Sequence, residues 1–150
     1  CLKCIDAPGL DQPWNPHFYY QPGLHKGTIC GSFDIRLEPG AIVTHEWRDQ
    51  HSPYRVGPSL IFDGANKQLQ ANGKTVLELP ADTWLHIEIT CPLKEGKYTL
   101  TVTTQGQEPK TIPDIATDNP EFRALDWCGF ISNAQTSVAW YLDNVKIEEQ

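Results

Sequence analysis

The side chains best suited to chemistry gather in one stretch, which reads HEWRDQHSPYR from position 45 to position 55. Sugar recognition needs an aromatic ring for the apolar C–H side of a pyranose, and planar polar groups for adjacent hydroxyls. Trp47 or Tyr54 is the expected platform. The polar groups expected beside it are Glu46, Arg48, Asp49 and Arg55. This stretch therefore predicts a carbohydrate-binding site.

The alternation of the same stretch leaves a second interpretation of Trp47 open. On an extended strand Glu46 and Arg48 share one face, whereas His45 and Trp47 share the other. Large aromatic side chains dominate the cores of β-sandwiches. In this alternative Trp47 is buried, and Arg48 forms a structural ion pair with Asp49 at the sheet edge.

A second aromatic segment, PWNPHFYY at positions 13–20, offers Trp14 and Tyr19 as further ligand contacts. Aromatic side chains near a chain end also commonly cover the edge of a sheet. Residues 1–27 are accordingly expected to form an amino-terminal strap, with or without a direct ligand contact.

The elements that must position these residues are strands. Apolar residues recur with period 2 between turn residues, and no stretch of a dozen residues has helical spacing. The expected strands are 33–37, 41–48, 58–62, 67–71, 74–79, 84–90, 97–104, 127–132 and 138–147. Pro39-Gly40 is expected to join the first two as an antiparallel pair, Glu95-Gly96 to join a hairpin, and residues 58–79 to form a meander. The tryptophans at positions 84 and 127 fall within apolar alternation and are expected in the core.

Many short strands in 150 residues predict one all-β domain, an antiparallel jelly-roll β-sandwich spanning residues 1–150. Nineteen acidic and twelve basic residues give a formal charge of −7, and no Lys/Arg cluster offers a strip for phosphates, which argues against nucleic-acid binding. The longest apolar runs fall far short of the roughly 20 residues that span a bilayer. No export signal stands at the start, so we expect it to be removed or upstream.

Five cysteines, an odd number at irregular spacing, leave at least one thiol without a partner in the chain. Cys1 and Cys4 form a lone CxxC, for which zinc, disulfide and free-thiol readings are open. Cys91 and Cys128 lie in apolar, strand-like settings, where cysteine usually acts as a small buried hydrophobe.

Three stretches, GSFDIRL at 31–37, TWLHIEI at 83–89 and WYLDNVKI at 140–147, give the chain a family likeness. The sequence resembles the concanavalin A-like and laminin G-like jelly rolls of secreted bacterial glycan-processing proteins. The resemblance implies a carbohydrate-binding or accessory module, an extracellular, cell-surface or periplasmic location, and a neighbouring catalytic domain as possible partner.

In such modules an aspartate of a closing strand like YLDNV often holds a structural calcium, and Asp143 matches that position. Calcium takes six to eight oxygen ligands, so Asp6 or Asp11 is expected to join it. The alternative is that Asp143 only accepts hydrogen bonds from a neighbouring loop.

Noncatalytic carbohydrate binding is our first hypothesis, a structural or protein-interaction sandwich the second, and a hydrolase or lyase the third. Glycosidases place two carboxylates across the scissile bond, but Glu46 and Asp49 are three residues apart and face opposite ways on a strand. Glycosidases of this fold usually carry a Glu-x-Asp-x-x-Glu arrangement, which the sequence lacks. A lyase would need a base and a charge neutraliser; the candidates are His45 or His51, with Tyr54 and Arg55.

Overall fold

The computed structural model describes residues 1–150 as twelve β-strands and no helix. The strands are β1 Leu2–Asp6, β2 His17–Tyr20, β3 Thr28–Leu37, β4 Ile42–Arg48, β5 Val56–Asp63, β6 Gln68–Ala71, β7 Lys74–Glu78, β8 Leu85–Pro92, β9 Lys97–Thr104, β10 Lys110–Ala116, β11 Trp127–Ser132 and β12 Val138–Glu149. The all-β prediction is confirmed. No element has the length and apolar character of a membrane-crossing helix.

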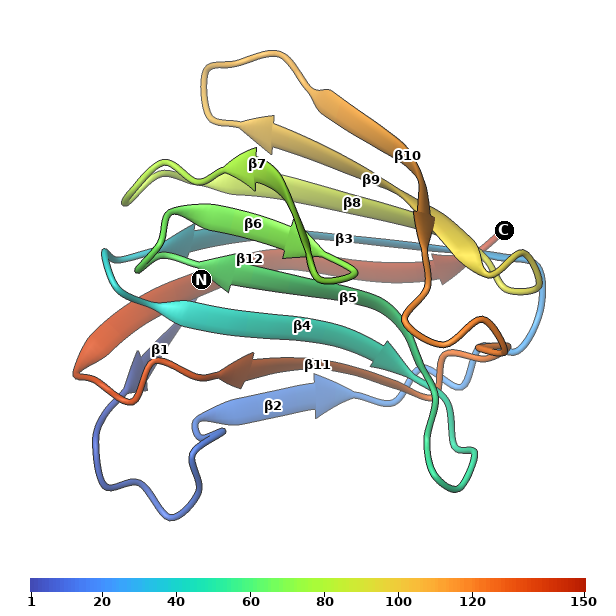
Figure 1. The fold of residues 1–150 in the computed structure, drawn as a ribbon, viewed down its shortest axis with the longest axis horizontal. Coiled ribbons are helices and arrows are strands. Elements are labelled where there is room, and N and C mark those ends of the chain that lie inside the picture. Colours follow the sequence, from blue (N-terminus) through green and yellow to red (C-terminus); the bar gives the residue numbers. More distant parts are fainter.

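The strands form two six-stranded antiparallel sheets that lie face to face (Figure 1). The first sheet has the order β1-β12-β3-β8-β9-β10, and the second has the order β2-β11-β4-β5-β6-β7. Strands that are distant in sequence lie side by side in both sheets, as β11 does beside β4. The second sheet carries the candidate site on its outer face.

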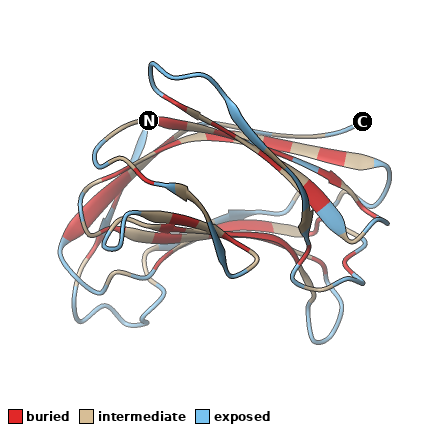
Figure 2. Cartoon of the chain, turned by 45° about the horizontal axis from the view of Figure 1, so that its top comes forward, coloured by how far each residue is buried: buried red, intermediate tan, exposed pale blue.

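Alternating apolar side chains build the core between the two sheets. Buried and half-buried residues alternate along all of β3 and β4, and Figure 2 shows the same banding on both sheets. Phe33 of β3 meets His45 of β4 across the interior, with ring centroids 4.7 Å apart. The inner face of each sheet is thus covered by the inner face of the other.

Two of the expected strand pairings are confirmed, and one is wrong. β8 pairs with β9 as a hairpin, and β5, β6 and β7 form the expected meander. However, β3 pairs with β12 and β8, whereas β4 pairs with β11 and β5. The Pro39-Gly40 turn therefore carries the chain from one sheet to the other, and alternation alone does not distinguish this crossing from a hairpin.

Residues 1–27 contribute an edge strand to each sheet. β1 pairs with β12 at the edge of the first sheet, and β2 pairs with β11 at the edge of the second, so both lie on one side of the sandwich in Figure 1. The sequence did not indicate β10, another edge strand, because Pro113 interrupts it and most of its residues are exposed. Edge strands bury little apolar surface and have correspondingly weak patterns.

All five cysteines are free thiols. Cys1 is exposed whereas Cys4 is buried, so the CxxC does not present two thiols to one zinc ion. Cys91 and Cys128 are buried as expected, and burial raises the pKa of each of these two thiols to about 12. These buried thiols pack as small apolar groups.

Candidate functional site

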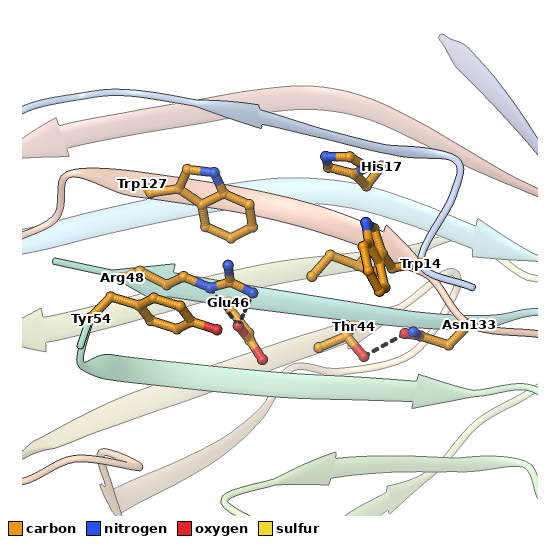
Figure 3. Close-up of a pocket in the computed structure, with 9 residues that line it drawn as sticks. Trp14, His17, Thr44, Glu46, Arg48, Tyr54, Trp127 and Asn133 are labelled. Atoms are coloured by element: carbon orange, nitrogen blue, oxygen red, sulfur yellow. Dashed lines mark hydrogen bonds and ion pairs between the residues drawn. The ribbon is translucent and has the colours of Figure 1, made fainter. Parts of the chain in front are cut away.

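A hollow of about 440 Å³ opens on the outer face of the second sheet (Figure 3). Its volume falls within the roughly 300 to 1,000 Å³ typical of small-molecule sites. The residues around it come from β2, β4, β11 and three loops: Trp14, His17, Thr44, Glu46, Arg48, Tyr54, Trp127, Ile131 and Asn133. Aromatic rings stand at both ends, with hydrogen-bonding groups between them.

β4 supplies polar residues to this hollow because of its strict alternation. Glu46 and Arg48 point outward, as the strand pattern predicted. Trp47 points inward and is 1% exposed, so its assignment as a sugar platform is wrong and the core alternative holds. Its indole N–H donates to Nε2 of His45 at 3.0 Å.

His45 completes this buried network on the inner face. Its Nδ1 lies 3.0 Å from the Gly129 carbonyl, and desolvation lowers its pKa from 6.5 to about 3. The ring is therefore neutral, with Nδ1–H donating to the carbonyl and Nε2 accepting from Trp47. A buried, fully engaged imidazole cannot serve as the base proposed for a lyase.

The expectation that Trp127 lies in the core is wrong, because its half-buried ring lines the hollow and takes the platform position predicted for Trp47. Its ring lies over Gly129, where an added Cβ would stand 2.0 Å from the ring. Register explains the placement, because Cys128 and Phe130 of β11 point inward and are buried. The inward Cys128-x-Phe130 alternation and the glycine two residues after Trp127 were the signals available in the sequence.

Four side chains form an aromatic–guanidinium stack along this face: Tyr19, Trp127, Arg48 and Tyr54. The Tyr19 and Trp127 rings are 5.5 Å apart at an interplanar angle of 28°. The Arg48 guanidinium lies 4.0 Å from the Trp127 centroid and 4.5 Å from that of Tyr54. The stack joins β2, β11, β4 and the β4–β5 loop into one continuous surface.

Glu46 fixes the orientation of Arg48. Nε of Arg48 donates to Oε2 of Glu46 at 2.8 Å, and Nη2 lies 2.7 Å from the same oxygen. Both side chains are about one-fifth exposed. The predicted Arg48–Asp49 ion pair is wrong, because the partner of Arg48 is Glu46, two residues back on the same face.

Asp49 and Arg55 shape the loop that presents Tyr54. Asp49 is 5% exposed and accepts hydrogen bonds from the backbone N–H groups of His51 and Arg55. Its Oδ2 lies 2.6 Å from Nε of Arg55. Although burial favours a higher value, these hydrogen bonds and the Arg55 charge lower the pKa of Asp49. Asp49 is thus buried rather than presented to a sugar, and the pair supports Tyr54, which is 54% exposed.

The opposite end of the hollow is formed by Trp14 and its neighbours. Trp14 is 47% exposed and lies in the β1–β2 loop. Thr44 donates a hydrogen bond to Oδ1 of Asn133 at 2.8 Å, which leaves the Asn133 amide N–H groups for a ligand (Figure 3). Asn133 was not identified from the sequence, because it follows β11 in a loop without periodicity.

A second carboxylate lies beyond Glu46 on this face. The backbone N–H of Asp118 donates to the carbonyl of Gly57 in β5, two residues before Ser59, the cross-strand partner of Glu46. Partial desolvation and the Glu46 charge raise the pKa of Asp118. The sequence did not predict this proximity, because it depends on hydrogen bonds between residues 118–119 and β5.

The strand register does not fit a calcium shared by Asp6 and Asp143. Asp6 pairs with Val138, whereas Asp143 follows Leu142, the partner of Leu2 at the other end of β1. Asp6 is buried, with one oxygen accepting from the Ala134 backbone and the other lacking a partner. Asp143 accepts the N–H of Asn144, the next residue of β12, and lies 3.4 Å from the Cys1 amino group, so its partners do not come from a neighbouring loop as the alternative expected. Calcium binding by either residue alone stays a prediction.

No protein-family model and no curated protein matches the chain. Among solved structures it is similar to a sialidase (TM-score 0.73, 14% identity), over 99% of this chain and 15% of that chain. It is similar to the catalytic domain of a glycoside hydrolase family 131 protein from Coprinopsis cinerea (TM-score 0.58, 18% identity), over 85% of this chain and 58% of that chain. It is also similar to basic winged bean lectin (TM-score 0.60, 12% identity), over 97% of this chain and 85% of that chain.

At these identities the similarity shows the fold. The chain is an antiparallel jelly-roll β-sandwich of the concanavalin A-like kind, as the sequence resemblance implied. It spans about 15% of the sialidase chain and 58% of the fungal one.

Proposed function

We propose that this chain is a noncatalytic carbohydrate-binding domain and that the hollow on the outer face of the second sheet is its binding site. The observation that carries the proposal is the aromatic–guanidinium stack, which ends in exposed tyrosines and borders a polar floor. Sugar rings have an apolar face and a hydroxyl-bearing rim, so they need both kinds of surface at once.

The polar floor supports this interpretation further. The Asn133 amide and the Glu46 and Arg48 side chains lie between the aromatic ends, where hydroxyls of a bound sugar would reach them. Because the network between Arg48 and Glu46 exists without ligand, little side-chain entropy remains to be lost on binding. The presence of a lectin among the structural neighbours is consistent with such a role.

The test is a glycan array followed by calorimetry on the best ligand. We expect binding with an affinity that falls at least about tenfold in Tyr54→Ala, which removes a largely exposed ring that lies outside the core. Leu10→Ala, which removes another exposed apolar side chain that does not line the hollow, is the control and should bind normally. Failure of all glycans to bind the folded protein contradicts the proposal.

Glycoside hydrolysis is a second candidate, and the Glu46–Asp118 pair is the observation that favours it. A carboxyl group with a raised pKa can donate a proton while its ionised neighbour acts as base or nucleophile. We nevertheless propose no catalysis, because Glu46 is held by Arg48. Reducing-sugar release from a polysaccharide panel should stay at background; turnover that disappears in Asp118→Asn contradicts the noncatalytic assignment.

We also propose that the domain is an accessory module of an exported protein. The sequence resemblance to secreted glycan-processing proteins supports export, and the match to 15% of a sialidase chain supports a place beside other domains. Fractionation of cells that express the parent gene measures the location directly. Retention of the whole parent protein in the cytoplasm contradicts export.

A further inference from the structure

Arg48 provides the permanent positive charge among the residues that line the hollow. This charge is already matched, since Nε and Nη2 both lie within 2.8 Å of one Glu46 carboxylate oxygen. The rings of Trp127 and Tyr54 flank the guanidinium at 4.0 and 4.5 Å. An incoming anion therefore finds no uncompensated positive charge in the hollow while Arg48 stays paired with Glu46.

The surroundings of the pair are acidic. The Asp118 backbone is hydrogen-bonded to Gly57 of β5, two residues before Ser59, the cross-strand partner of Glu46. Partial desolvation and the Glu46 charge raise the pKa of Asp118. The whole chain carries a formal charge of −7, which also repels anionic ligands at a distance. Neutral hydroxyls, by contrast, can donate to the carboxylates and accept from the remaining Arg48 N–H groups.

We propose that the site selects uncharged oligosaccharides over glycans that carry carboxylate or sulfate groups, and that Glu46 is the residue that sets this selectivity. The inference rests on the proposed carbohydrate-binding function and names its substrate class. An acidic glycan approaches the Glu46 carboxylate at short range and loses hydration without gaining an uncompensated positive charge as partner. Discrimination therefore comes from repulsion of acidic glycans as much as from attraction of neutral ones.

The test uses a matched pair of ligands. One is the neutral oligosaccharide with the strongest array signal, and the other is the same oligosaccharide with its primary hydroxyls oxidised to carboxylates. Calorimetry at pH 7 and 0.15 M NaCl should give the wild-type protein a preference of about tenfold or more for the neutral form. Comparable affinity of the two forms for the wild-type protein overturns the proposal.

Glu46→Gln removes the negative charge and leaves the Arg48 charge uncompensated. The ratio of neutral to oxidised affinity should fall by about tenfold in this variant, because Arg48 can now pair with the ligand carboxylate. Glu88→Gln changes the net charge equally at an exposed position of β8 in the first sheet and should keep the wild-type ratio. An unchanged ratio in folded Glu46→Gln overturns the proposal.

Two further measurements keep the inference testable if Glu46→Gln does not fold. Arg48→Gln leaves the Glu46 charge unopposed and should increase the preference for the neutral form. Raising the salt concentration should reduce the wild-type preference, since screening weakens the repulsion of the oxidised ligand. A smaller preference in folded Arg48→Gln overturns the proposal, whereas absence of any glycan binding by the wild type overturns the proposed function with it.

Discussion

Trp47 and Trp127 occupy comparable positions on neighbouring strands but opposite faces of the second sheet. Each indole ring packs against a glycine and occupies the space that a Cβ would need there. Trp47 packs against Gly31 of the facing sheet, and Trp127 packs over Gly129 of its own strand. Trp47 is 1% exposed and bonded to His45, whereas Trp127 is half-buried and stacks between Tyr19 and Arg48. The same residue type therefore stabilises the sandwich on one face and shapes the candidate site on the other.

Removal of the inward ring should give the largest effect on stability. Trp47→Ala leaves a cavity and an unpaired His45 nitrogen, so we expect a loss of about 3 to 5 kcal/mol in the free energy of unfolding. Urea denaturation measures it. Trp127→Ala should cost about 1 kcal/mol or less because its ring reaches solvent. Equal losses in the two variants contradict the assignment of the rings to different roles.

Lowering the pH should reduce the stability of the folded protein through His45 in the core. The pKa of the folded protein's His45 is depressed to about 3 from 6.5, so its contribution is present above about pH 6.5 and is lost as pH falls toward 3. Between pH 7 and pH 5 we expect a loss of about 2 kcal/mol from this residue. Urea denaturation of the wild type and of His45→Gln at both pH values measures it. A pH dependence that the substitution leaves unchanged contradicts the role of His45.

The two glycines provide a smaller, paired test. In Gly31→Ala the new methyl group meets the Trp47 ring at 2.5 Å inside the core, so a loss of about 1 to 3 kcal/mol in stability is expected. In Gly129→Ala the methyl group displaces the outward Trp127 ring, so glycan affinity should fall with a smaller loss of stability. Thermal melting and calorimetry separate the two effects. If Gly129→Ala loses stability but keeps its glycan affinity, the result contradicts the role of Trp127 in the binding site.

The fold was predictable from the sequence where one face of a strand is buried. The alternation of β4, β8 and β9 identified these strands, and it also placed Glu46 and Arg48 together. It could not assign strands to sheets, since β3 and β4 alternate equally well as a hairpin or as facing strands. Edge strands β1, β2 and β10 bury too little apolar surface to show a clear pattern.

The site was predictable only in part because it depends on contacts between distant segments. Arg48 and Tyr54 come from one stretch of sequence, but Trp127 joins them through the pairing of β11 with β4. Asp49 and Arg55 look like ligand groups in sequence, yet their mutual hydrogen bonds show them to be supports for the loop. Residue type indicated the chemistry, and register decided which side chains meet.

The placement of the glycan site on the outer face of the second sheet is tested most directly by comparing glycan binding by the wild-type protein and Trp127→Ala. Both proteins are measured at a temperature where each is fully folded. We expect calorimetry to detect an oligosaccharide ligand for the wild type, and Trp127→Ala to lower its affinity at least about tenfold while thermal melting stays cooperative. Undiminished binding by a folded Trp127→Ala protein would contradict the placement of the site on the outer face of the second sheet.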